Sequence, residues 1–540
     1  MKTAGSARAW ELAAALAFAA LTVLLFINKA YHADEPLYLP AARHILADPL
    51  HPFAFELNYY GRSVPYREIN NTPPLLMYLL AGALKLTAGR EWGMRLCFLP
   101  FDLAAAAALY LLAARFLKRP LLPVLIVLAT PAYWINMGHL MPEKLALASG
   151  LWGLVGLLRW TDPEEPGGAG RRAAFWWSSG CMALALLSKY NAAALLLAGA
   201  AAGLLRGAGL RKVALWAVVG CAGLAAYLAA DFLCGGAAAK AAWMVTRQAE
   251  ALPTAAWSHR LRSLLAFLGG GAVVTALWPL FLKRLDPRRL AVVAIFCFVL
   301  FSPFLDLGSV RSVDRATGIA LAFGTVVLFG AVLRPCPGRN LWLPWLAAGL
   351  AVCAVYWSVM ARTVLLAVPP AVFLLAGLLE ADLSERRGTA LQAASLALVF
   401  CLGLSLAWVD AGYAASQRSL AHDVASRYLS QGRRVWVTGH WGLQYYLESA
   451  GGRSLDLGRG GWDEVRPGDV VVVPRVNTNV IRPNRRLLAD VKVQETSSSV
   501  PLRLLCSGRC EGGFYSSVMG FLPFSLSLEP VDTHEIVEVL

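Results

Sequence analysis

The stretch WELAAALAFAALTVLLFIN, residues 10–28, decides the fold class of this chain. It is an almost uncharged apolar run of the length that a helix needs to cross a bilayer, and it follows Lys2 and Arg8. This opening resembles a secretory signal peptide, but no small-x-small cleavage site follows the run through Asn28. We therefore interpret residues 9–28 as a retained first membrane span.

Apolar runs of similar length recur along most of the chain. Hydrophobic residues make up 58% of the 540 positions and charged residues 15%, whereas a soluble protein is about half apolar and a quarter charged. This composition excludes a disordered protein and argues against an ordinary soluble enzyme. Counting about twenty residues per crossing predicts about 13 transmembrane helices. Their ranges are 9–28, 95–117, 121–138, 142–160, 173–188, 191–206, 212–232, 261–283, 289–306, 315–333, 341–358, 363–380 and 389–410.

Another apolar run, 73–88, is short and opens with Pro73 and Pro74, so we predict a re-entrant or interfacial helix rather than a crossing. The basic residues support this choice, because leaving the run out puts the basic loops on the same side as Lys2 and Arg8. This bias predicts a cytoplasmic N-terminus and an external C-terminus. The net charge of +15 then belongs to cytoplasmic loops, and we predict a lipid bilayer, not a nucleic acid, as partner.

The predicted topology leaves three loops and the C-terminal tail outside the cytoplasm. The loops occupy residues 29–94, 137–145 and 233–260. We therefore divide the chain into a transmembrane domain, residues 1–410, and an extracytoplasmic domain, residues 411–540. Functional residues are expected in these outside segments, because charged groups beside a membrane are costly to desolvate and often functional.

The C-terminal tail has the pattern of a small α/β domain rather than of membrane helices. Residues 435–438 and 470–473 are predicted strands, and residues 443–448 are a predicted helix. Cys506 and Cys510 lie close together here and could form a disulfide in an oxidising compartment. The other cysteines form no metal-binding or scaffold pattern.

Two acidic motifs lie on separate external segments. Asp34 and Glu35 follow the first span, and Pro36 places them at the N-terminus of a helix. Glu143, preceded by Pro142, begins a later span after a short turn. Helix capping or a polar turn explains each motif taken alone. Two acids that converge in one cavity could instead act as a general base and as a ligand for a metal or an acceptor hydroxyl.

Several external cations run against the charge bias. An anionic lipid headgroup entering from the membrane would need such groups near its phosphate. Snorkelling to ordinary lipids is the simpler explanation for any one of them, but the set favours a phosphate site. These residues are Arg43, Arg62, Lys189, His259, Arg260, Arg311, Arg315 and Arg362.

Other common functional motifs are absent from the sequence. There is no GxxxxGK[ST] phosphate loop, no GxGxxG between a strand and a helix, no HExxH zinc motif and no GxSxG nucleophile motif. The sequence therefore argues against nucleotide-driven transport by this chain alone.

Five short motifs occur in a fixed order along residues 1–410. They are Asp34-Glu35-Pro36, Asn71-Thr72-Pro73-Pro74-Leu75-Leu76-Met77-Tyr78, Met141-Pro142-Glu143, Leu187-Ser188-Lys189-Tyr190, and Arg362 followed by Pro369-Pro370. With this order and topology, the chain resembles the GT-C membrane glycosyltransferases. The pattern is most similar to the bacterial branch near protein O-mannosyltransferases and aminoarabinose transferases (glycosyltransferase family 39 or the RgtA/B/C/D-like group).

The resemblance implies transfer of a sugar from a polyprenyl-phosphate donor to a glycan, lipid or protein acceptor. The transfer would invert the anomeric centre on the outer face of a bacterial cytoplasmic membrane. Asp34 would be the general base and Glu143 the second catalytic acid. A divalent metal assists some branches, and Glu143 and His259 are the candidate ligands here. The residues expected to bind the donor phosphate or the substrate are Glu35, Arg62, Lys189, Tyr190, Arg311 and Arg315.

The sequence departs from this family at Asn71 and Thr72, where the aminoarabinose branch has Glu and Lys that bind metal and donor phosphate. This departure weakens the case for a metal and for that branch's substrate. A lipid-linked glycan transporter or flippase is one alternative, for which ionisable residues within spans are typical; Asp102 and Asp231 come nearest to this. A non-catalytic assembly subunit is the other alternative.

Overall fold

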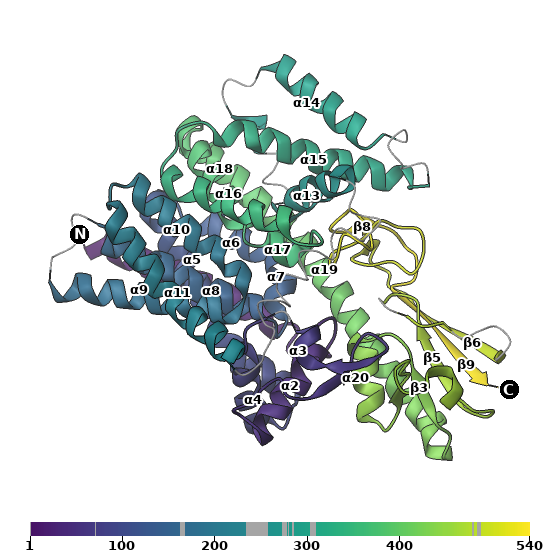
Figure 1. Cartoon of the computed structure of the whole chain (residues 1–540). Coiled ribbons are helices and arrows are strands. Elements are labelled where there is room, and N and C mark those ends of the chain that lie inside the picture. The colour runs from purple at the N-terminus through teal and green to yellow at the C-terminus, as the bar shows by residue number, and fades with distance from the viewer. Residues whose placement is uncertain are drawn as a thin grey trace.

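A computed structural model describes most of the chain as a helical body with a sheet near its C-terminal end (Figure 1). Some predicted features lie partly or wholly outside the described residues: Asn71, most of the loop 233–260, and parts of the spans 261–283 and 289–306. The described residues are 2–70, 72–162, 168–233, 257–272, 278, 280–282, 286–302, 309–477, 480–482 and 488–539.

Long apolar helices identify the chain as a polytopic helical membrane protein. Within the described residues, 4 helices are long and apolar enough to cross a membrane, judged by length and composition. There are 5 if α6 and α7, which bend by 62°, count as one span. The full number of crossings stays a prediction. The helices concerned are α5 (Glu91–Phe116), α6 (Leu121–Ala129), α7 (Pro131–Gly138), α11 (Leu210–Leu233), α15 (Ser312–Val332) and Glu385–Gln431, which contains α19 (Glu385–Arg427).

Each predicted span is largely helical where the structure describes it, with turns or bends at 25–28, 130, 301–302, 356–358 and 365–367 among others. The span predicted at 142–160, for example, is α8 (Pro142–Trp160). The continuous apolar composition of these runs explains this agreement. The remaining helices of the body are α1 (Lys2–Leu24), α9 (Ala169–Ser188), α10 (Ala193–Leu205), α13 (Trp257–Ala272), α14 (Pro287–Leu300), α16 (Arg339–Val355), α17 (Ala361–Val364) and α18 (Val368–Asp382).

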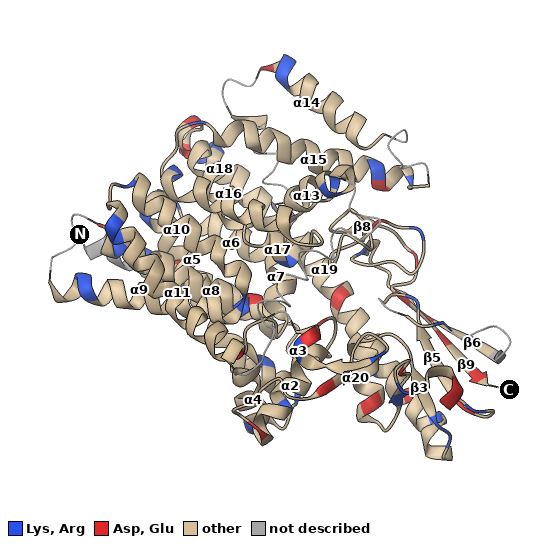
Figure 2. Cartoon of the chain, in the orientation of Figure 1, with Lys and Arg blue, Asp and Glu red and all other residues tan. Residues whose placement is uncertain are grey.

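Charged residues lie mainly at helix ends, in the first loop and in the C-terminal part (Figure 2). An exception is Asp102 on α5, which accepts a hydrogen bond from the Lys144 ammonium on α8 at 2.8 Å. Both side chains are buried, so each compensates the charge of the other. The pair joins two helices and provides a structural role for Asp102.

The break between α6 and α7 has a local cause. Pro131 has no backbone N–H to donate to the preceding turn, and this interrupts the helix. Thr130 is extended, and its hydroxyl accepts a hydrogen bond from the Tyr133 N–H at 3.3 Å, which caps α7. After α7 the chain turns at His139 and enters α8, and this path places Glu143 beside the first loop.

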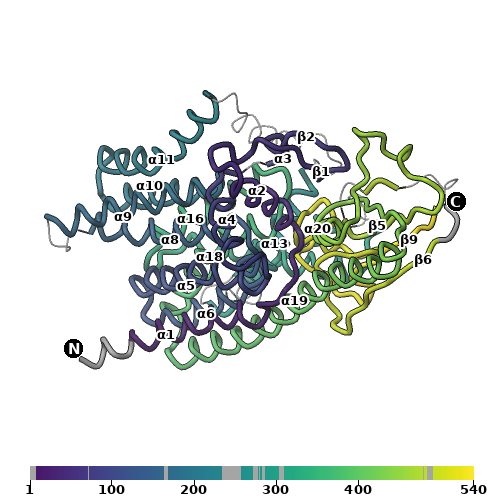
Figure 3. The backbone as a smooth tube through the Cα atoms, turned by 90° about the horizontal axis from the view of Figure 1, so that it is seen from below, coloured from purple at the N-terminus to yellow at the C-terminus, as the bar shows by residue number. Residues whose placement is uncertain are grey.

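The first loop folds into small elements at one end of the helical body, where α2, α3 and α4 lie together (Figures 1 and 3). α4 confirms that the apolar run 73–88 is helical, and it packs against α2. Its position relative to a membrane stays a prediction. The elements are α2 (Glu35–Ala47), β1 (Glu56–Asn58), β2 (Ser63–Pro65), α3 (Tyr66–Ile69) and α4 (Leu75–Thr87).

The C-terminal part contains a five-stranded sheet with the order β4-β3-β5-β9-β6. β3 pairs in parallel with β4 and β5, whereas β9 pairs antiparallel with β5 and β6. The predicted strands 435–438 and 470–473 and the predicted helix 443–448 are confirmed. The elements are β3 (Val435–Val437), α20 (Trp441–Ser449), β4 (Arg453–Ser454), β5 (Val470–Pro474), β6 (Leu488–Thr496) and β9 (Asp532–Val539).

α19 connects the helical body to this sheet (Figures 1 and 3). Its 43 residues run without a break, so the predicted boundary between residues 410 and 411 falls inside one helix. The C-terminal half of α19 packs against α20 and the sheet, where Leu420 and Val424 are buried. The two predicted domains therefore share a rigid element.

The segment between β6 and β9 returns to the helical body. Its strands β7 (Leu502–Arg503) and β8 (Ser525–Leu526) pair with each other, and Phe514 is buried in the core of the body. The carbonyl of Phe514 accepts a hydrogen bond from the Ala361 N–H at 3.0 Å, which ties this segment to α17. Cys506 and Cys510, also in this segment, are joined by a disulfide, as the sequence suggested.

Close packing of α19 against α6 predicts a strong effect of Gly403→Ala. A methyl group at Gly403 would collide with the backbone carbonyl of Ala129, so the helices would have to separate. We expect a loss of about 1–3 kcal/mol in stability, measured as a lower thermal unfolding temperature in detergent. Gly412→Ala on the same helix is the matched control, because a methyl group there meets no atom within 4 Å. Equal melting temperatures for the two variants would contradict the expected collision.

Candidate active site

Asp34 lies in the turn that leads into α2. Ala33 before it has a φ of 52°, in the left-handed region. Asp34 occupies the N-cap position of α2, but its side chain makes no capping hydrogen bond. Its carboxylate instead accepts hydrogen bonds from Arg362 Nη1 at 2.5 Å and from the Tyr59 hydroxyl at 3.3 Å. Helix capping therefore does not explain this side chain.

Glu143 lies in the first turn of α8 and faces the same place. It forms an ion pair with the Lys189 ammonium and lies 3.5 Å from Arg362 Nε. Lys189 follows the end of α9 directly and is extended, so its side chain leaves the helix axis toward α8. The break in the apolar run at Lys189 thus corresponds to a turn that supplies a buried cation.

Arg362 bridges the two acids from α17. Its guanidinium contacts Asp34 through Nη1 and Glu143 through Nε, and Lys189 completes a set of two acids and two cations. We call Asp34, Glu143, Lys189 and Arg362 the four-charge cluster. Its members come from four separate segments, and their formal charges cancel.

Solvent reaches the members of this cluster unequally. The side chain of Asp34 is 25% exposed, whereas those of Glu143 and Lys189 are 5% and 7% exposed. Arg362 is intermediate at 13%. Asp34 is therefore the carboxylate that an incoming molecule meets first, and Glu143 is placed to hold the cations behind it.

The surroundings keep Asp34 ionised. Burial alone would raise its pKa, but the Arg362 guanidinium beside it holds the pKa below the usual value. Burial raises the pKa of Tyr59 well above its usual value, and the Asp34 carboxylate raises it further. At neutral pH an ionised Asp34 therefore lies beside a neutral phenol, and it can accept a proton.

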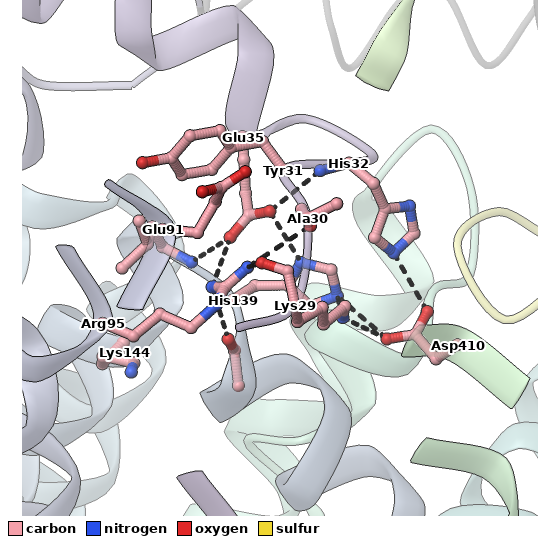
Figure 4. Close-up of polar contacts among 12 residues, drawn as sticks. Lys29, Ala30, Tyr31, His32, Glu35, Glu91, Arg95, His139, Lys144 and Asp410 are labelled. Carbon is pink, nitrogen blue, oxygen red and sulfur yellow. Dashed lines mark hydrogen bonds and ion pairs between the residues drawn. The ribbon is translucent and has the colours of Figure 1, made fainter. Parts of the chain in front are cut away.

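Glu35, the other acid of the first motif, lies in a buried polar network (Figure 4). Its carboxylate accepts hydrogen bonds from Arg95 Nη1 at 2.9 Å, from the Leu140 N–H at 2.8 Å and from the His32 N–H at 2.9 Å. The residue is 1% exposed. These contacts hold the first loop against α5 and the turn before α8, and the role of Glu35 in substrate binding stays a prediction.

The other predicted binding residues lie elsewhere. Arg311 forms an ion pair with Asp314 at 2.8 Å, and Arg315 donates a hydrogen bond to Ser312 Oγ at 3.3 Å. Arg62 lies beside Gly458 of the C-terminal part. Within the described residues, no hydrogen bond or ion pair joins any of these residues, or Tyr190, to the four-charge cluster. Tyr190 directly follows Lys189 and begins a short 3-10 turn.

The structure thus brings together Asp34, Glu143 and Lys189 from the predicted set. Arg362, predicted only as an external cation and as part of the fifth motif, is the residue that joins them. The signal for it was the position of Arg362 before a double proline. Sequence alone does not show that this arginine faces two acids more than 200 residues away, because that contact depends on how α17 packs.

A divalent metal does not fit between Asp34 and Glu143. Arg362 and Lys189 already occupy Asp34 Oδ2 and Glu143 Oε1, and their two positive charges would repel a divalent cation placed between the acids. His259, the other predicted ligand, lies elsewhere: its Nε2 is 2.9 Å from the Ser517 carbonyl. We therefore derive no chemical step through a metal at this site.

Comparisons with known proteins give only distant similarities. No family model and no curated protein matches the chain. Among solved structures, ArnT from Cupriavidus metallidurans in the apo state is 17% identical, with a TM-score of 0.42, over 87% of this chain and 93% of ArnT. The same ArnT bound to undecaprenyl phosphate gives 17% identity and a TM-score of 0.40 over 86% and 92% of the two chains.

A third similarity is to the archaeal oligosaccharyltransferase AglB from Archaeoglobus fulgidus, in complex with an inhibitory peptide and a dolichol-phosphate. It is 15% identical, with a TM-score of 0.44, over 82% of this chain and 63% of AglB. At TM-scores below 0.5, these similarities do not decide what this chain does. Its function has to be inferred from its own residues.

Proposed function

We propose that the chain is an integral membrane glycosyltransferase of the GT-C class. It transfers a sugar from a polyprenyl-phosphate donor to an acceptor on the extracytoplasmic face of a bacterial cytoplasmic membrane. The observation that carries this proposal is the four-charge cluster, in which a reachable, ionised Asp34 lies against Arg362, with Glu143 and Lys189 behind. The order of the five sequence motifs supports the same assignment.

Asp34 is the general base in this proposal. Its carboxylate takes the proton of an acceptor hydroxyl as that oxygen attacks the anomeric carbon of the donor sugar. The new oxygen–carbon bond forms on the face opposite the phosphate, and the bond to the phosphate oxygen breaks with its electron pair. Attack from the opposite face inverts the anomeric centre, and the phosphate leaves with the lipid.

The cations of the cluster serve the leaving phosphate. Arg362 presents a planar guanidinium, a group that binds phosphate well, and Lys189 is a second cation in the same cluster. Preorganised positive charge stabilises the charge that develops on the phosphate oxygen. Glu143 holds both cations in position, and this is why it is needed although it is buried.

Location beside long apolar helices suits a lipid-linked donor. A polyprenyl chain stays in the bilayer, so its phosphate has to reach the site from the membrane surface. α2 and α4 of the first loop are candidates for the walls of that entry, because they pack together and Asp34 is the N-cap residue of α2. The acceptor, whether glycan, lipid or protein, would approach from the aqueous side.

The test is transfer by the purified full-length chain in lipid vesicles. Lipid-linked sugars and envelope glycans are extracted from a strain that lacks the gene, and mass spectrometry follows the sugar onto the acceptor. We expect product that depends on the chain and on the polyprenyl-phosphate donor. Movement of lipid-linked sugar across the vesicle membrane without product would support the transporter alternative instead. Inactivity with every extracted donor would support the assembly-subunit alternative.

The lowered pKa of Asp34 predicts the pH dependence of transfer. The carboxylate is the active form, and it is lost only as pH falls through this lowered pKa. We therefore expect the rate to stay constant from neutral pH down to about pH 5, whereas a histidine base would lose activity near pH 6.5. Initial rates measured in overlapping buffers give the profile. A loss of half the rate near pH 6.5 would argue against Asp34 as the base.

A further inference from the structure

A second buried cluster lies on the other side of the first-loop turn, apart from the four-charge cluster. It contains His32 from that turn, His139 from the turn before α8, Asp410 from α19 and Tyr515 from the returning segment of the C-terminal part. Figure 4 shows His32, His139 and Asp410 pointing toward one another. None of these side chains has a part in the proposed transfer.

The donor atoms of this cluster have the spacing of a metal site. Ligands of a tetrahedral zinc ion bound at about 2.0–2.1 Å are about 3.3 Å apart. His32 Nε2 lies 3.0 Å from Asp410 Oδ1, and His139 Nε2 lies 3.6 Å from Asp410 Oδ2. The Tyr515 hydroxyl lies 2.9 Å from His32 Nε2 and 3.2 Å from His139 Nε2. Donor atoms of His32, His139 and Asp410 thus lie within 4.8 Å of one another, and the Tyr515 hydroxyl lies beside both imidazoles.

Behind one of the two histidines lies a carboxylate, as in many metal sites. Nδ1 of His32 and Nδ1 of His139 are buried and make no hydrogen bond in the structure. Nδ1 of His139 lies 3.7 Å from Glu35 Oε2. Arg95 donates a hydrogen bond to the other oxygen of Glu35, Oε1, and so holds the carboxylate in place. A carboxylate behind a metal-binding histidine fixes the ring and leaves Nε2 free to bind.

We propose that His32, His139, Asp410 and Tyr515 form a binding site for a divalent transition metal of the zinc class. Two imidazoles, one carboxylate and one phenol oxygen suit Zn²⁺ in chemistry and in number. All four positions are filled by the protein, so the metal is structural rather than catalytic. This proposal does not depend on the proposed sugar transfer.

Lys29 is the competitor for this site. Its ammonium forms an ion pair with Asp410 and lies 3.1 Å from His139 Nε2. It therefore supplies positive charge to Asp410 when no metal is bound. Binding of the metal replaces these contacts, so the lysine lowers the affinity and its removal raises it.

The site connects separate parts of the chain, and two of these parts also carry the acids of the four-charge cluster. His32 is two residues before Asp34, His139 is four residues before Glu143, and Asp410 is on the helix that leads to the C-terminal sheet. A metal here would fix the separation of the two acids and hold the C-terminal part against them. Bound metal should therefore raise the unfolding temperature of the whole chain.

The experiment is a titration of the full-length, EDTA-treated protein in detergent with Co²⁺, whose visible absorption bands report tetrahedral coordination. We expect one Co²⁺ per chain, displacement by Zn²⁺, and a higher unfolding temperature with Zn²⁺. His32→Ala and Asp410→Asn should abolish the bands. His259→Ala, which removes a partly buried histidine elsewhere, is the matched control and should keep them. Lys29→Met should bind Co²⁺ roughly tenfold more tightly or better.

Each other outcome overturns the proposal. Absence of stoichiometric Co²⁺ from both the natural chain and Lys29→Met would show that the cluster is a set of hydrogen bonds and ion pairs. Binding in Lys29→Met alone would show that Lys29 is the resident cation. Unchanged bands in His32→Ala would place the metal elsewhere. Size-exclusion profiles show that each variant is folded, and Asp410→Asn, which keeps the side-chain shape, covers the case in which His32→Ala does not fold.

Discussion

Asp34→Asn is expected to lower sugar transfer by about 10²- to 10⁴-fold, the range that a general base contributes. The amide keeps the size of the side chain. Arg362 and Tyr59 bond different oxygens of Asp34, so the amide oxygen can keep the hydrogen bond from Arg362 while the amide NH2 donates to the Tyr59 hydroxyl oxygen. It cannot take the proton of an acceptor hydroxyl. The variant should therefore fold and bind donor, and a rate measurement at saturating donor isolates the missing step.

Asp48→Asn is the matched control for this prediction. Asp48 is another carboxylate of the first loop, at the far end of α2, where it pairs with His51 at 3.0 Å on the surface. Its variant should transfer sugar at the natural rate. Transfer by Asp34→Asn within a factor of about three of the natural rate would show that another group removes the proton, and the base assignment would fail.

The helices of this chain were predictable because each one is determined by the residues of its own segment. An apolar run of about twenty residues specifies a helix through its own hydrogen bonds and its own hydrophobicity. α8, for example, begins and ends where the sequence predicted, because Pro142 favours a first turn. The strand Val470–Pro474 was predictable for a similar reason, since five successive buried apolar residues leave few alternatives.

The candidate site was predictable only in part, because its contacts join distant segments. The sequence identified Asp34 and Glu143 as acids on separate external turns, and both now contact Arg362. The same reasoning grouped Glu35 with Asp34, although one residue along the turn reverses the direction of the side chain. Glu35 faces Arg95 instead, and no local pattern distinguishes the two directions.

Partners of buried charges were the least predictable feature. Lys29 and Asp410 are 381 residues apart in the chain, and their ion pair depends on the packing of α19 beside the first turn. Arg311 shows the converse: it is an external cation with the right charge, but Asp314 three residues later satisfies it locally. Composition reports which charges exist, whereas only packing decides which of them remain available for a substrate.

Because the charges of the four-charge cluster balance one another, removing one of them should change the environment of the others. Two acids without their cations would be costly to bury, and the cations alone would repel each other. Arg362 contacts both acids, so removing it changes the environment of Asp34 as well as the charge that meets the donor phosphate. A single substitution of Arg362 should therefore alter two independent measurements.

Arg362→Gln is expected to lower sugar transfer by about 10²- to 10³-fold, because a preorganised cation no longer stabilises the leaving phosphate. It should also move the acidic limb of the pH–rate profile upward by about 1–3 pH units. The guanidinium is what holds the pKa of Asp34 below its usual value against burial, so without it burial raises that pKa. Rates of Arg362→Gln measured across the acidic range report both effects.

Arg334→Gln is the matched control. Arg334 lies away from the site and forms a bidentate ion pair with Asp382, with N–O distances of 2.8 and 2.9 Å. Breaking that pair should leave both the rate and the pH profile unchanged. Arg362→Lys separates the two roles of Arg362. A lysine keeps the positive charge and therefore keeps most of the lowering of the Asp34 pKa. It lacks the planar guanidinium that can contact both acids and a phosphate at once. We therefore expect its pH profile to stay near that of the natural chain while its rate remains low. If Arg362→Gln instead lost rate with an unmoved acidic limb, the group whose protonation sets that limb would not be Asp34, and the roles assigned to the two acids would have to be exchanged.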